Sequence, residues 1–184
     1  YIEKIDIESL KKNGYAGSKL DHVKRVKEIV DGDFAGRIDF IAQNVKTTDF
    51  EDPVFKPYAL RSVNGAPLTI IDGNRAMRCA YLAKGAGIIG FTITNGTAYD
   101  GAGVWCESSE VLVSNCVIAG NSASYGGGAY GGTLYNCTLT GNSAGIGGGA
   151  YGSTLTNCTL TGNSAYEGGG VYGGTLDNCT LIGN

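Results

Sequence analysis

Short stretches in which apolar and polar residues alternate recur through the second half of this chain. Cys137-Thr-Leu-Thr140 and Cys158-Thr-Leu-Thr161 are two of them, and both are followed by Gly-Asn-Ser. Alternation with a period of two, in short runs bounded by glycine, is typical of β-strands, whereas a helix needs an apolar stripe at 3.6-residue spacing. The pattern therefore predicts a succession of short strands.

The strands repeat with a fixed period. Asn-Cys pairs stand at positions 115/116, 136/137, 157/158 and 178/179, which gives a spacing of 21 residues three times in succession. A Gly-Gly-Gly segment, a small or β-branched residue and a Tyr lie between consecutive pairs. A unit of about three short strands cannot bury its own apolar side, so its copies must stack to make a core. We therefore predict an all-β parallel β-helix, a solenoid of 21-residue coils.

Alternation also sorts the side chains of each coil into an inner and an outer face. Because Cys137 and Leu139 share one face while Thr138 and Thr140 take the other, we expect the apolar pair to point into the core. The expected inward cysteine column is Cys116, Cys137, Cys158 and Cys179. The expected turn ladder, in which each side-chain amide bonds the next coil, is Asn115, Asn136, Asn157 and Asn178.

The cysteines of this column are expected to be free thiols that serve as small apolar side chains. Neighbouring coils lie about 4.8 Å apart with parallel Cα–Cβ bonds, whereas a disulfide needs Cβ atoms about 3.8 Å apart. A single line of identical thiols also lacks the tetrahedral arrangement that zinc requires, so neither a metal nor another cofactor is predicted. The sequence identifies no partner for Cys79 or Cys106.

The amino-terminal part is organised differently. Residues 1–17 match no pattern that we can assign. A capping-box-like start at Ser18 precedes an apolar stripe at helical spacing, so residues 18–58 are expected to hold a capping α-helix and the first strands. Coils are expected over residues 59–184, with early strands at 59–63, 68–71 and 88–94. The step from Phe91 to Cys116 is 25 residues rather than 21, which predicts a loop insertion at 107–110.

Three segments that follow the expected helix and first strand resemble a known family. They are LRSVNGAPLTIIDGN at 60–74, GFTITNG at 90–96 and the NCTLTGNSA repeats. Over residues 18–184 they are similar to bacterial right-handed parallel β-helix repeat proteins of the pectate-lyase-like superfold. The resemblance implies a right-handed coil and an exported or cell-surface protein. It implies no single activity, because the superfold hosts many functions, polysaccharide lyases and hydrolases among them.

The charges narrow the function classes. All 14 Lys and Arg residues lie at or before Lys84, whereas residues 85–184 carry five acids and no Lys, Arg or His. This distribution offers nothing to a nucleic acid or an anionic membrane surface. No apolar run approaches the roughly 20 residues of a spanning helix, so no membrane span is predicted. The chain begins at Tyr1, which we interpret as removal of a signal peptide or trimming of the sequence.

The same distribution argues against catalysis in the coils. A lyase of the resembled superfold is expected to use a basic proton abstractor and acidic calcium ligands, and no base follows Lys84. A glycoside hydrolase needs two carboxylates beside one glycosidic bond. The clustered acids Asp100, Glu107 and Glu110 are better explained as solvated loop residues, and Asp72, with its Gly-Asn neighbours, as a structural turn. No catalytic residue is predicted.

Two outward-facing arrays suggest alternative functions. An aromatic row at Trp105, Tyr130, Tyr151 and Tyr172 would hold a glycan if its rings were exposed, although rings that cover the glycine-rich backbone are the favoured interpretation. Thr pairs at 92/94, 138/140 and 159/161 would form rows about 4.8 Å apart, with steps of about 6.7 Å along each strand, as in an ice-binding surface. Residues 117/119 and 180/182 interrupt those rows.

The favoured function is a structural, adhesive or self-assembling role outside the cell or at its surface. The chain stops at Asn184 within a coil, without a capping helix or a charged edge strand. We therefore expect either a longer solenoid or head-to-tail pairing of this edge with another copy, which would give a homo-oligomer or filament. Asn-Cys-Thr triplets at 136, 157 and 178 fit glycosylation sequons, but turn-ladder asparagines are expected to be buried.

Overall fold

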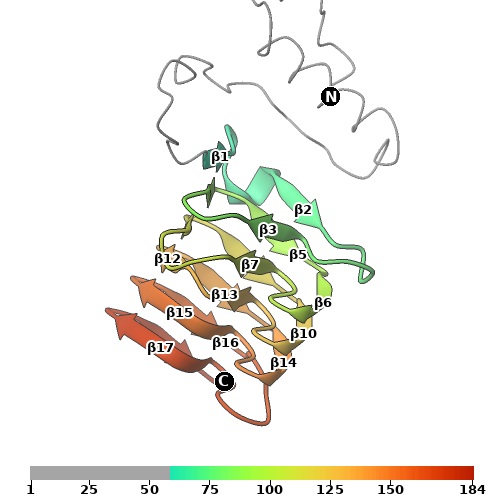
Figure 1. Cartoon of the computed structure of the whole chain (residues 1–184), viewed down its shortest axis with the longest axis vertical. Coiled ribbons are helices and arrows are strands. Elements are labelled where there is room, and N and C mark those ends of the chain that lie inside the picture. The colour runs from blue at the N-terminus through green and yellow to red at the C-terminus, as the bar shows by residue number, and fades with distance from the viewer. Residues whose placement is uncertain (1–58) are drawn as a thin grey trace, which may run out of the picture. The chain divides into compact units, whose positions relative to one another are not determined.

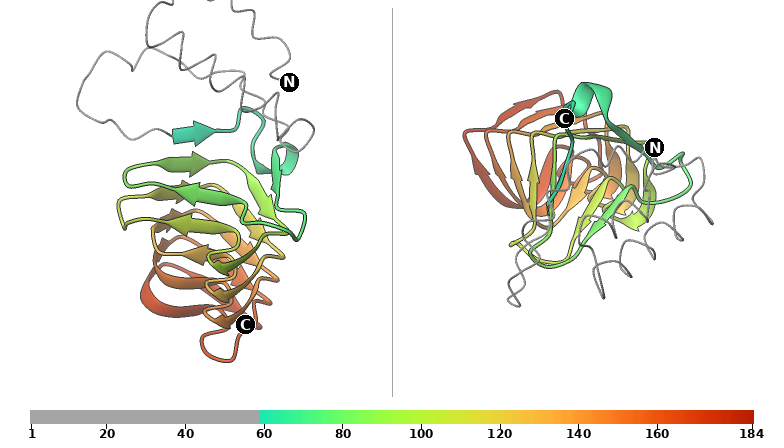
Figure 2. Two further views of the ribbon diagram at one scale, coloured as in Figure 1. Left: turned by 45° about the vertical axis from the view of Figure 1, so that its right-hand side comes forward. Right: turned by 90° about the horizontal axis from the view of Figure 1, so that it is seen from above.

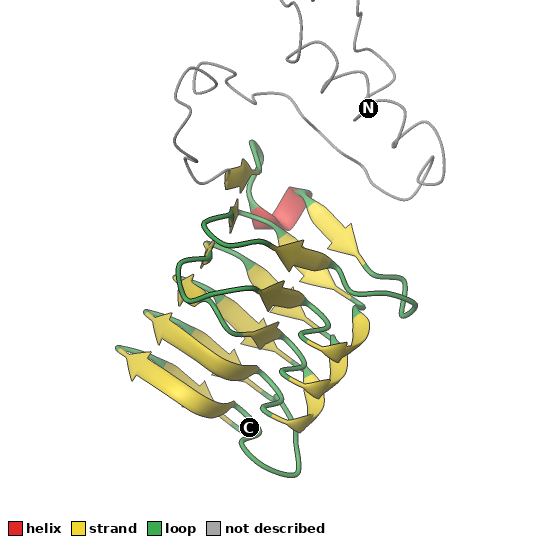
Figure 3. Cartoon of the chain, in the orientation of Figure 1, coloured by secondary structure: helices red, strands yellow, loops and turns green. Residues whose placement is uncertain are grey.

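The computed structural model describes residues 59–184, and these form a right-handed parallel β-solenoid of about five coils (Figure 1). The prediction of an all-β parallel solenoid is confirmed. The expected capping helix and first strands within 18–58, and the unassigned segment 1–17, lie outside the described residues. Among residues 59–184 the helical structure is one short 3₁₀ turn, η3 (Ala66–Leu68), which Figure 3 draws in red.

The strands form three parallel sheets, and successive coils lie over one another when viewed along the stack (Figure 2). The first sheet contains β1 (Ala59–Arg61), β3 (Ala80–Leu82), β4 (Gly87–Ile89), β7 (Val104–Cys106), β8 (Leu112–Ser114), β11 (Ala129–Tyr130), β12 (Thr133–Tyr135), β15 (Ala150–Thr156) and β17 (Val171–Asp177). The second contains β2 (Ile70–Asp72), β5 (Thr92–Thr94), β9 (Val117–Ala119), β13 (Thr138–Thr140), β16 (Thr159–Thr161) and β18 (Thr180–Ile182). The third contains β6 (Thr97–Asp100), β10 (Ser122–Tyr125) and β14 (Ser143–Ile146).

The register follows the sequence repeat. Leu134 pairs with Leu155, an offset of 21, whereas Thr92 pairs with Val117, an offset of 25. The extra residues lie at one corner: β7 and β8 are separated by Glu107–Val111, whereas only Gly131 and Gly132 separate β11 from β12. The predicted insertion at 107–110 is therefore confirmed, and it leaves the pairing of the strands on either side intact.

Two early strands differ from their predicted bounds. Residues 88–94 form two strands instead of one, because Gly90 takes a φ of 80° and turns the chain from β4 into β5. Leu68 belongs to η3 and is 73% exposed, so β2 begins only at Ile70. A continuous apolar run does not reveal such a corner, because residues on both sides of it point into the same core.

The core consists of columns of equivalent side chains, one per coil. Ile118, Leu139 and Leu160 line the second sheet, and all three are 0% exposed. The corresponding column of the first sheet is Ile88, Val113, Leu134 and Leu155, and a column of small residues is Val104, Ala129 and Ala150. Burial of each large aliphatic side chain stabilises the fold by about 1.5–3 kcal/mol, so every added coil contributes its own share of the core.

The Gly-Gly-Gly segments form the corner at which the third sheet meets the first. Gly147 has a φ of 70°, a conformation that side-chain-bearing residues avoid. Gly148 has an ordinary φ, but a Cβ there would lie 2.5 Å from the carbonyl oxygen of Gly169 in the next coil. The triplet therefore permits the turn and also the close backbone approach between coils.

A buried asparagine ladder runs along the corner between the second and third sheets. The Asn142 side-chain nitrogen donates to Ile118 O at 2.9 Å and to Asn163 Oδ1 at 3.0 Å, and Asn142 Oδ1 accepts the main-chain N–H of Asn121 at 3.1 Å. Asn163 repeats the pattern with Asn184. The exposed fractions are 1% for Asn121, 0% for Asn142 and 2% for Asn163. Each amide thus satisfies inward-pointing backbone groups that the corner leaves unpaired.

This ladder is not the one that the sequence predicts. Asn115, Asn136, Asn157 and Asn178 take φ values of 51°, 53°, 54° and 48°, and form the corner between the first and second sheets. Their side chains face outward: three of the residues are exposed and Asn157 is half-buried. Asn178 donates to Asn157 Oδ1, which is the one bond between these amides in the described coils. Asn is suited to this column because it tolerates positive φ. The expectation that these asparagines are buried is therefore wrong, and burial does not count against the sequons at Asn136, Asn157 and Asn178.

We predict that Asn142→Ala lowers the free energy of unfolding by about 3–5 kcal/mol. The change leaves the main-chain N–H and the side-chain amide of Asn121 without the Asn142 Oδ1 that accepts both, at about 1–3 kcal/mol for each buried group, and it also removes the side-chain donor to Ile118 O and Asn163 Oδ1. Asn136→Gly is the matched control: it replaces an exposed asparagine at positive φ and should cost less than about 1 kcal/mol. Urea denaturation measures both, and equal losses would contradict the assignment of the ladder.

Candidate functional site

The outer face of the first sheet carries a continuous column of aromatic side chains. Trp105 on β7 pairs with Tyr130 on β11, which pairs with Tyr151 on β15, which pairs with Tyr172 on β17. Tyr81 on β3 pairs with Trp105 and extends the column by one coil. Sequence reasoning missed Tyr81 because no glycine triplet precedes it. The small residue before it, as in the later coils, was the available signal.

The rings of this column, which we call the aromatic stack, lie nearly parallel. The centroid distances are 4.8 Å for Tyr81–Trp105, 6.2 Å for Trp105–Tyr130, 5.1 Å for Tyr130–Tyr151 and 5.5 Å for Tyr151–Tyr172. The interplanar angles are between 8° and 15°. Such stacked pairs each contribute about 0.5–1.5 kcal/mol beyond their buried area. The strand register places equivalent side chains over one another, and the shared orientation of the rings then brings them into stacking contact.

The stacking limits what these rings can bind. Tyr81 is 58% exposed and Tyr172 39% exposed at the two ends of the stack, while the three rings between them are half-buried. A sugar ring binds an aromatic side chain through the face of the π-system. The faces of the inner rings are already occupied by their neighbours in the stack, so a glycan lying along it would meet ring edges.

Polar side chains near the first coils are held by local backbone contacts. The Arg78 guanidinium lies 5.9 Å from the centroid of the Trp105 ring and donates to Asp100 O at 2.8 Å. Asp72 Oδ1 accepts the main-chain N–H of Asn74 at 2.8 Å, which is the geometry of a structural turn. Arg78 and Asp72 thus have structural partners, and the acids of the insertion are the remaining polar candidates.

Those acids make contacts within their own corner. Glu107 Oε2 accepts the main-chain N–H of Lys84 at 2.6 Å, and Glu110 Oε1 lies 3.5 Å from Lys84 Nζ at an exposed position. Within residues 59–184 no three His, Cys, Asp or Glu side chains gather in a way that would hold a metal ion. Glu107 and Glu110 are thus both held by Lys84.

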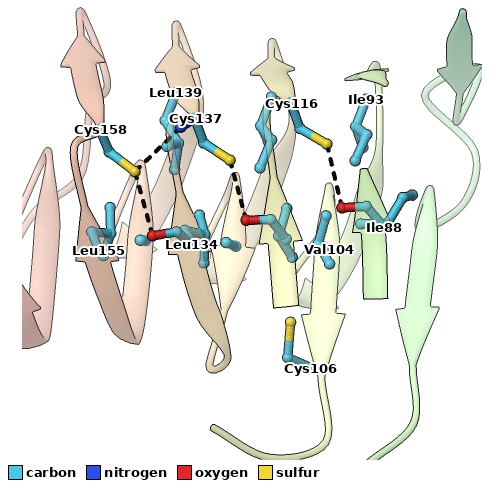
Figure 4. Close-up of a cluster of buried hydrophobic side chains, with 14 of the residues drawn as sticks. Ile88, Ile93, Val104, Cys106, Cys116, Leu134, Cys137, Leu139, Leu155 and Cys158 are labelled. Carbon is cyan, nitrogen blue, oxygen red and sulfur yellow. Dashed lines mark hydrogen bonds between the residues drawn. The ribbon is translucent and has the colours of Figure 1, made fainter. Parts of the chain in front are cut away.

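The inner face carries the cysteine column, which we call the thiol column. Figure 4 shows the sulfurs of Cys116, Cys137 and Cys158 in one row inside the coils. These three residues are each 1% exposed, and Cys179 at the end of the column is half-buried. All six cysteines of the chain are free thiols. The thiol column therefore places potentially reactive sulfur atoms in a part of the core that solvent barely reaches.

The thiols also make hydrogen bonds, a role that sequence reasoning missed. Cys158 Sγ accepts the main-chain N–H of Cys137 at 3.4 Å and donates to Leu134 O at 3.6 Å. Cys179 Sγ accepts the N–H of Cys158 in the same way. Cysteine fits here because the inward N–H after the positive-φ asparagine needs an acceptor that an aliphatic side chain lacks. Hydrogen bonding to the neighbouring thiols of Cys116 and Cys158, followed by burial, raises the pKa of Cys137.

Cys79 and Cys106 lie outside this column. Burial raises the pKa of Cys106 to about 12, and burial is also the largest cause that raises the pKa of Cys79 to about 11. Cys106 fits beneath a glycine pair of the next coil, where a Cβ on Gly132 would lie 2.6 Å from the Cys106 sulfur. Both thiols are therefore neutral at physiological pH, and Cys106 fills space in the core.

The threonine rows on the outer face of the second sheet are only partly free. Thr92 Oγ1 donates to Ala66 O at 2.7 Å and Thr94 Oγ1 to Ala119 O at 2.8 Å. Val117 and Ala119 then interrupt both rows. A pair of hydroxyl rows therefore spans only two coils, with Thr138 and Thr140 in one and Thr159 and Thr161 in the next, because Ile182 follows Thr161 in the second row.

Comparisons with protein-family models, with curated proteins and with solved structures each give no match. In the described part of the chain, no helix is long and apolar enough to cross a membrane. The fold itself defines the class: the chain is a parallel β-helix repeat protein.

We predict that Tyr151→Ala lowers the free energy of unfolding by about 2–3 kcal/mol, because the change removes two stacked contacts and the edge contact with Tyr125. Tyr151→Phe keeps the ring and should change stability by less than about 0.5 kcal/mol. Tyr166→Ala is a second control with an equally small expected effect, since Tyr166 is 98% exposed. Urea denaturation compares the three variants, and a neutral Tyr151→Ala would contradict a structural role.

The Cys106 thiol should make stability fall at alkaline pH. Its folded pKa of about 12 lies above the ordinary value of 9.0, so its contribution is complete below pH 9 and is lost as pH rises toward 12. Between pH 8 and pH 10 the wild type should therefore lose about 1.4 kcal/mol more stability than Cys106→Ala. Urea denaturation at both values tests this, and identical pH dependences would contradict it.

Proposed function

We propose that this protein is a non-catalytic structural solenoid, exported or displayed at the cell surface, whose coils are built to stack on equivalent coils, including those of a second copy. Within the described chain, β17 pairs only with β15 and β18 only with β16. Each therefore presents one unpaired strand edge, and such an edge is a template for another strand. The observation that carries the proposal is the uniform register, in which every coil, including the last one described, offers the same strands and side-chain columns to a neighbouring coil.

Within residues 59–184, the apolar columns reach the same edge uncovered. Leu181 is 46% exposed and Leu176 is 43% exposed, whereas Leu160 and Leu155, one coil earlier in the same columns, are each 0% exposed. One further coil of the same register would bury both side chains. The resulting gain of about 1 kcal/mol for each half-buried leucine supports coil-on-coil association.

The polar ladders specify what a partner coil must provide. The main-chain N–H of Cys158 bonds Cys179 Sγ, and that of Asn163 bonds Asn184 Oδ1. By the same geometry, Cys179 and Asn184 point their own N–H groups toward the open edge. A partner coil with a thiol and a buried asparagine at the repeat positions would accept both bonds. The coils of this chain have that chemistry, so a second copy is the proposed partner.

An enzymatic role has less support. The acids of the coil region contact Lys84 or lie apart, and no Lys, Arg or His follows Lys84. The aromatic stack occupies its own ring faces, which weakens the proposal of glycan binding. An export or surface location is proposed from the resemblance to exported β-helix proteins, and an adhesive role would follow from it.

We predict that the 184-residue chain associates reversibly in sedimentation velocity runs at increasing protein concentration. Leu181→Lys places a charge on the open edge and should raise the dissociation constant tenfold or more, since about 1.4 kcal/mol corresponds to a factor of ten. Thr159→Lys adds the same charge on the outer face one coil away and should leave association unchanged. A wild-type chain that stays monomeric at every concentration, or two variants that behave alike, would contradict the proposal.

A further inference from the structure

The thiol column has a spacing that suits a metal ion bound by two sulfurs, in contrast to zinc, which needs four ligands in a tetrahedral arrangement. The strands of neighbouring coils lie about 4.7–4.9 Å apart, and the register places equivalent cysteines directly over one another. Soft ions such as Cu(I) and Ag(I) prefer thiolate ligands and accept linear coordination by two sulfurs. With metal–sulfur bonds of about 2.3 Å, a linear unit spans about 4.6 Å between its sulfurs. This span is close to the coil spacing.

The geometry points to soft-metal sites in the thiol column, in which one Cu(I)-like ion is held linearly between the sulfurs of two cysteines from successive coils. Each thiolate serves one ion, so four cysteines in a row provide two sites, Cys116 with Cys137 and Cys158 with Cys179. Only two ligands are needed for each ion, which agrees with the lack of any three-ligand cluster among residues 59–184.

Three of the four sulfurs, those of Cys116, Cys158 and Cys179, accept a main-chain N–H, whereas the Cys137 sulfur donates to carbonyl oxygens and must lose its proton to the incoming ion. The main-chain N–H of Phe91 donates to Cys116 Sγ at 3.5 Å, and the N–H groups of Cys137 and Cys158 donate to the sulfurs of Cys158 and Cys179 at 3.4 Å. Hydrogen bonds donated to a sulfur stabilise its negative charge. The neighbouring aliphatic columns keep water out, which protects a soft ion from exchange.

Binding is a simple exchange of protons for metal. One monovalent ion and two thiols give a dithiolate complex with a charge of minus one and release two protons, with no change of oxidation state. Affinity should therefore increase with pH.

The test compares two double variants that have lost the same number of thiols. Cys116→Ser/Cys137→Ser keeps the adjacent pair Cys158 and Cys179, whereas Cys137→Ser/Cys179→Ser leaves two cysteines separated by a full coil. Cys79 and Cys106 remain in both variants as a constant background. Reduced protein is titrated anaerobically with Ag(I), and bound metal is counted by native mass spectrometry while proton release is measured by calorimetry.

We expect two tightly bound Ag(I) ions in the wild type, one in the variant with an adjacent pair and none in the variant without one, with two protons released for each ion. Equal binding by the two variants would overturn the proposal, and so would a wild type that binds no Ag(I). If either variant fails to fold, X-ray absorption of the silver-loaded wild type decides. Two sulfur neighbours in a linear arrangement support the site, and three or four sulfur neighbours overturn it.

Discussion

The parallel hydrogen bonding of one coil to the next is the interaction on which every other feature of this protein depends. It fixes both the distance between coils and the register, so a residue type that recurs every 21 positions becomes a physical column. Once the columns exist, each side chain interacts mainly with copies of itself. Aliphatic residues build the core, amides and thiols carry hydrogen bonds along the axis, and aromatic rings stack on the outside. Most side-chain contacts along the axis of the solenoid therefore join residues of the same type.

This dependence explains what sequence reasoning predicted well. The period, the alternation and the glycine corners follow from local rules, so the solenoid, its strands and the insertion at 107–110 were predictable. These local rules do not distinguish the two asparagine columns. Both repeat every 21 residues and both stand beside a corner, yet Asn142 is 0% exposed while Asn136 is exposed. Only the position of each residue relative to the turn decides whether its side chain points inward, and periodicity does not carry that information.

The candidate site was harder to predict, because contacts between coils decide what a side chain can still do. The aromatic row was predicted in full except for Tyr81, but the mutual stacking of its rings depends on ring orientation. The cysteines were expected to be plain apolar filling, whereas their sulfurs accept backbone N–H groups. In both columns the residue type was evident from the sequence. Which ring faces and sulfur atoms stay free to bind a ligand became clear only from the contacts between coils.

The insertion at Glu107–Glu110 shows that a corner of the solenoid can gain residues while the pairing of the strands on either side stays the same. The chain leaves the stack at one corner and returns to it, and Leu112 still pairs with Thr133 as if no residues had been added. Loop closure of a few extra residues costs little free energy, and the core on either side keeps its columns. Corners of this kind are therefore places where the chain can lengthen at little cost in folding free energy. A solenoid of repeating coils can in this way carry a local, non-repeating surface while its interior columns stay unbroken.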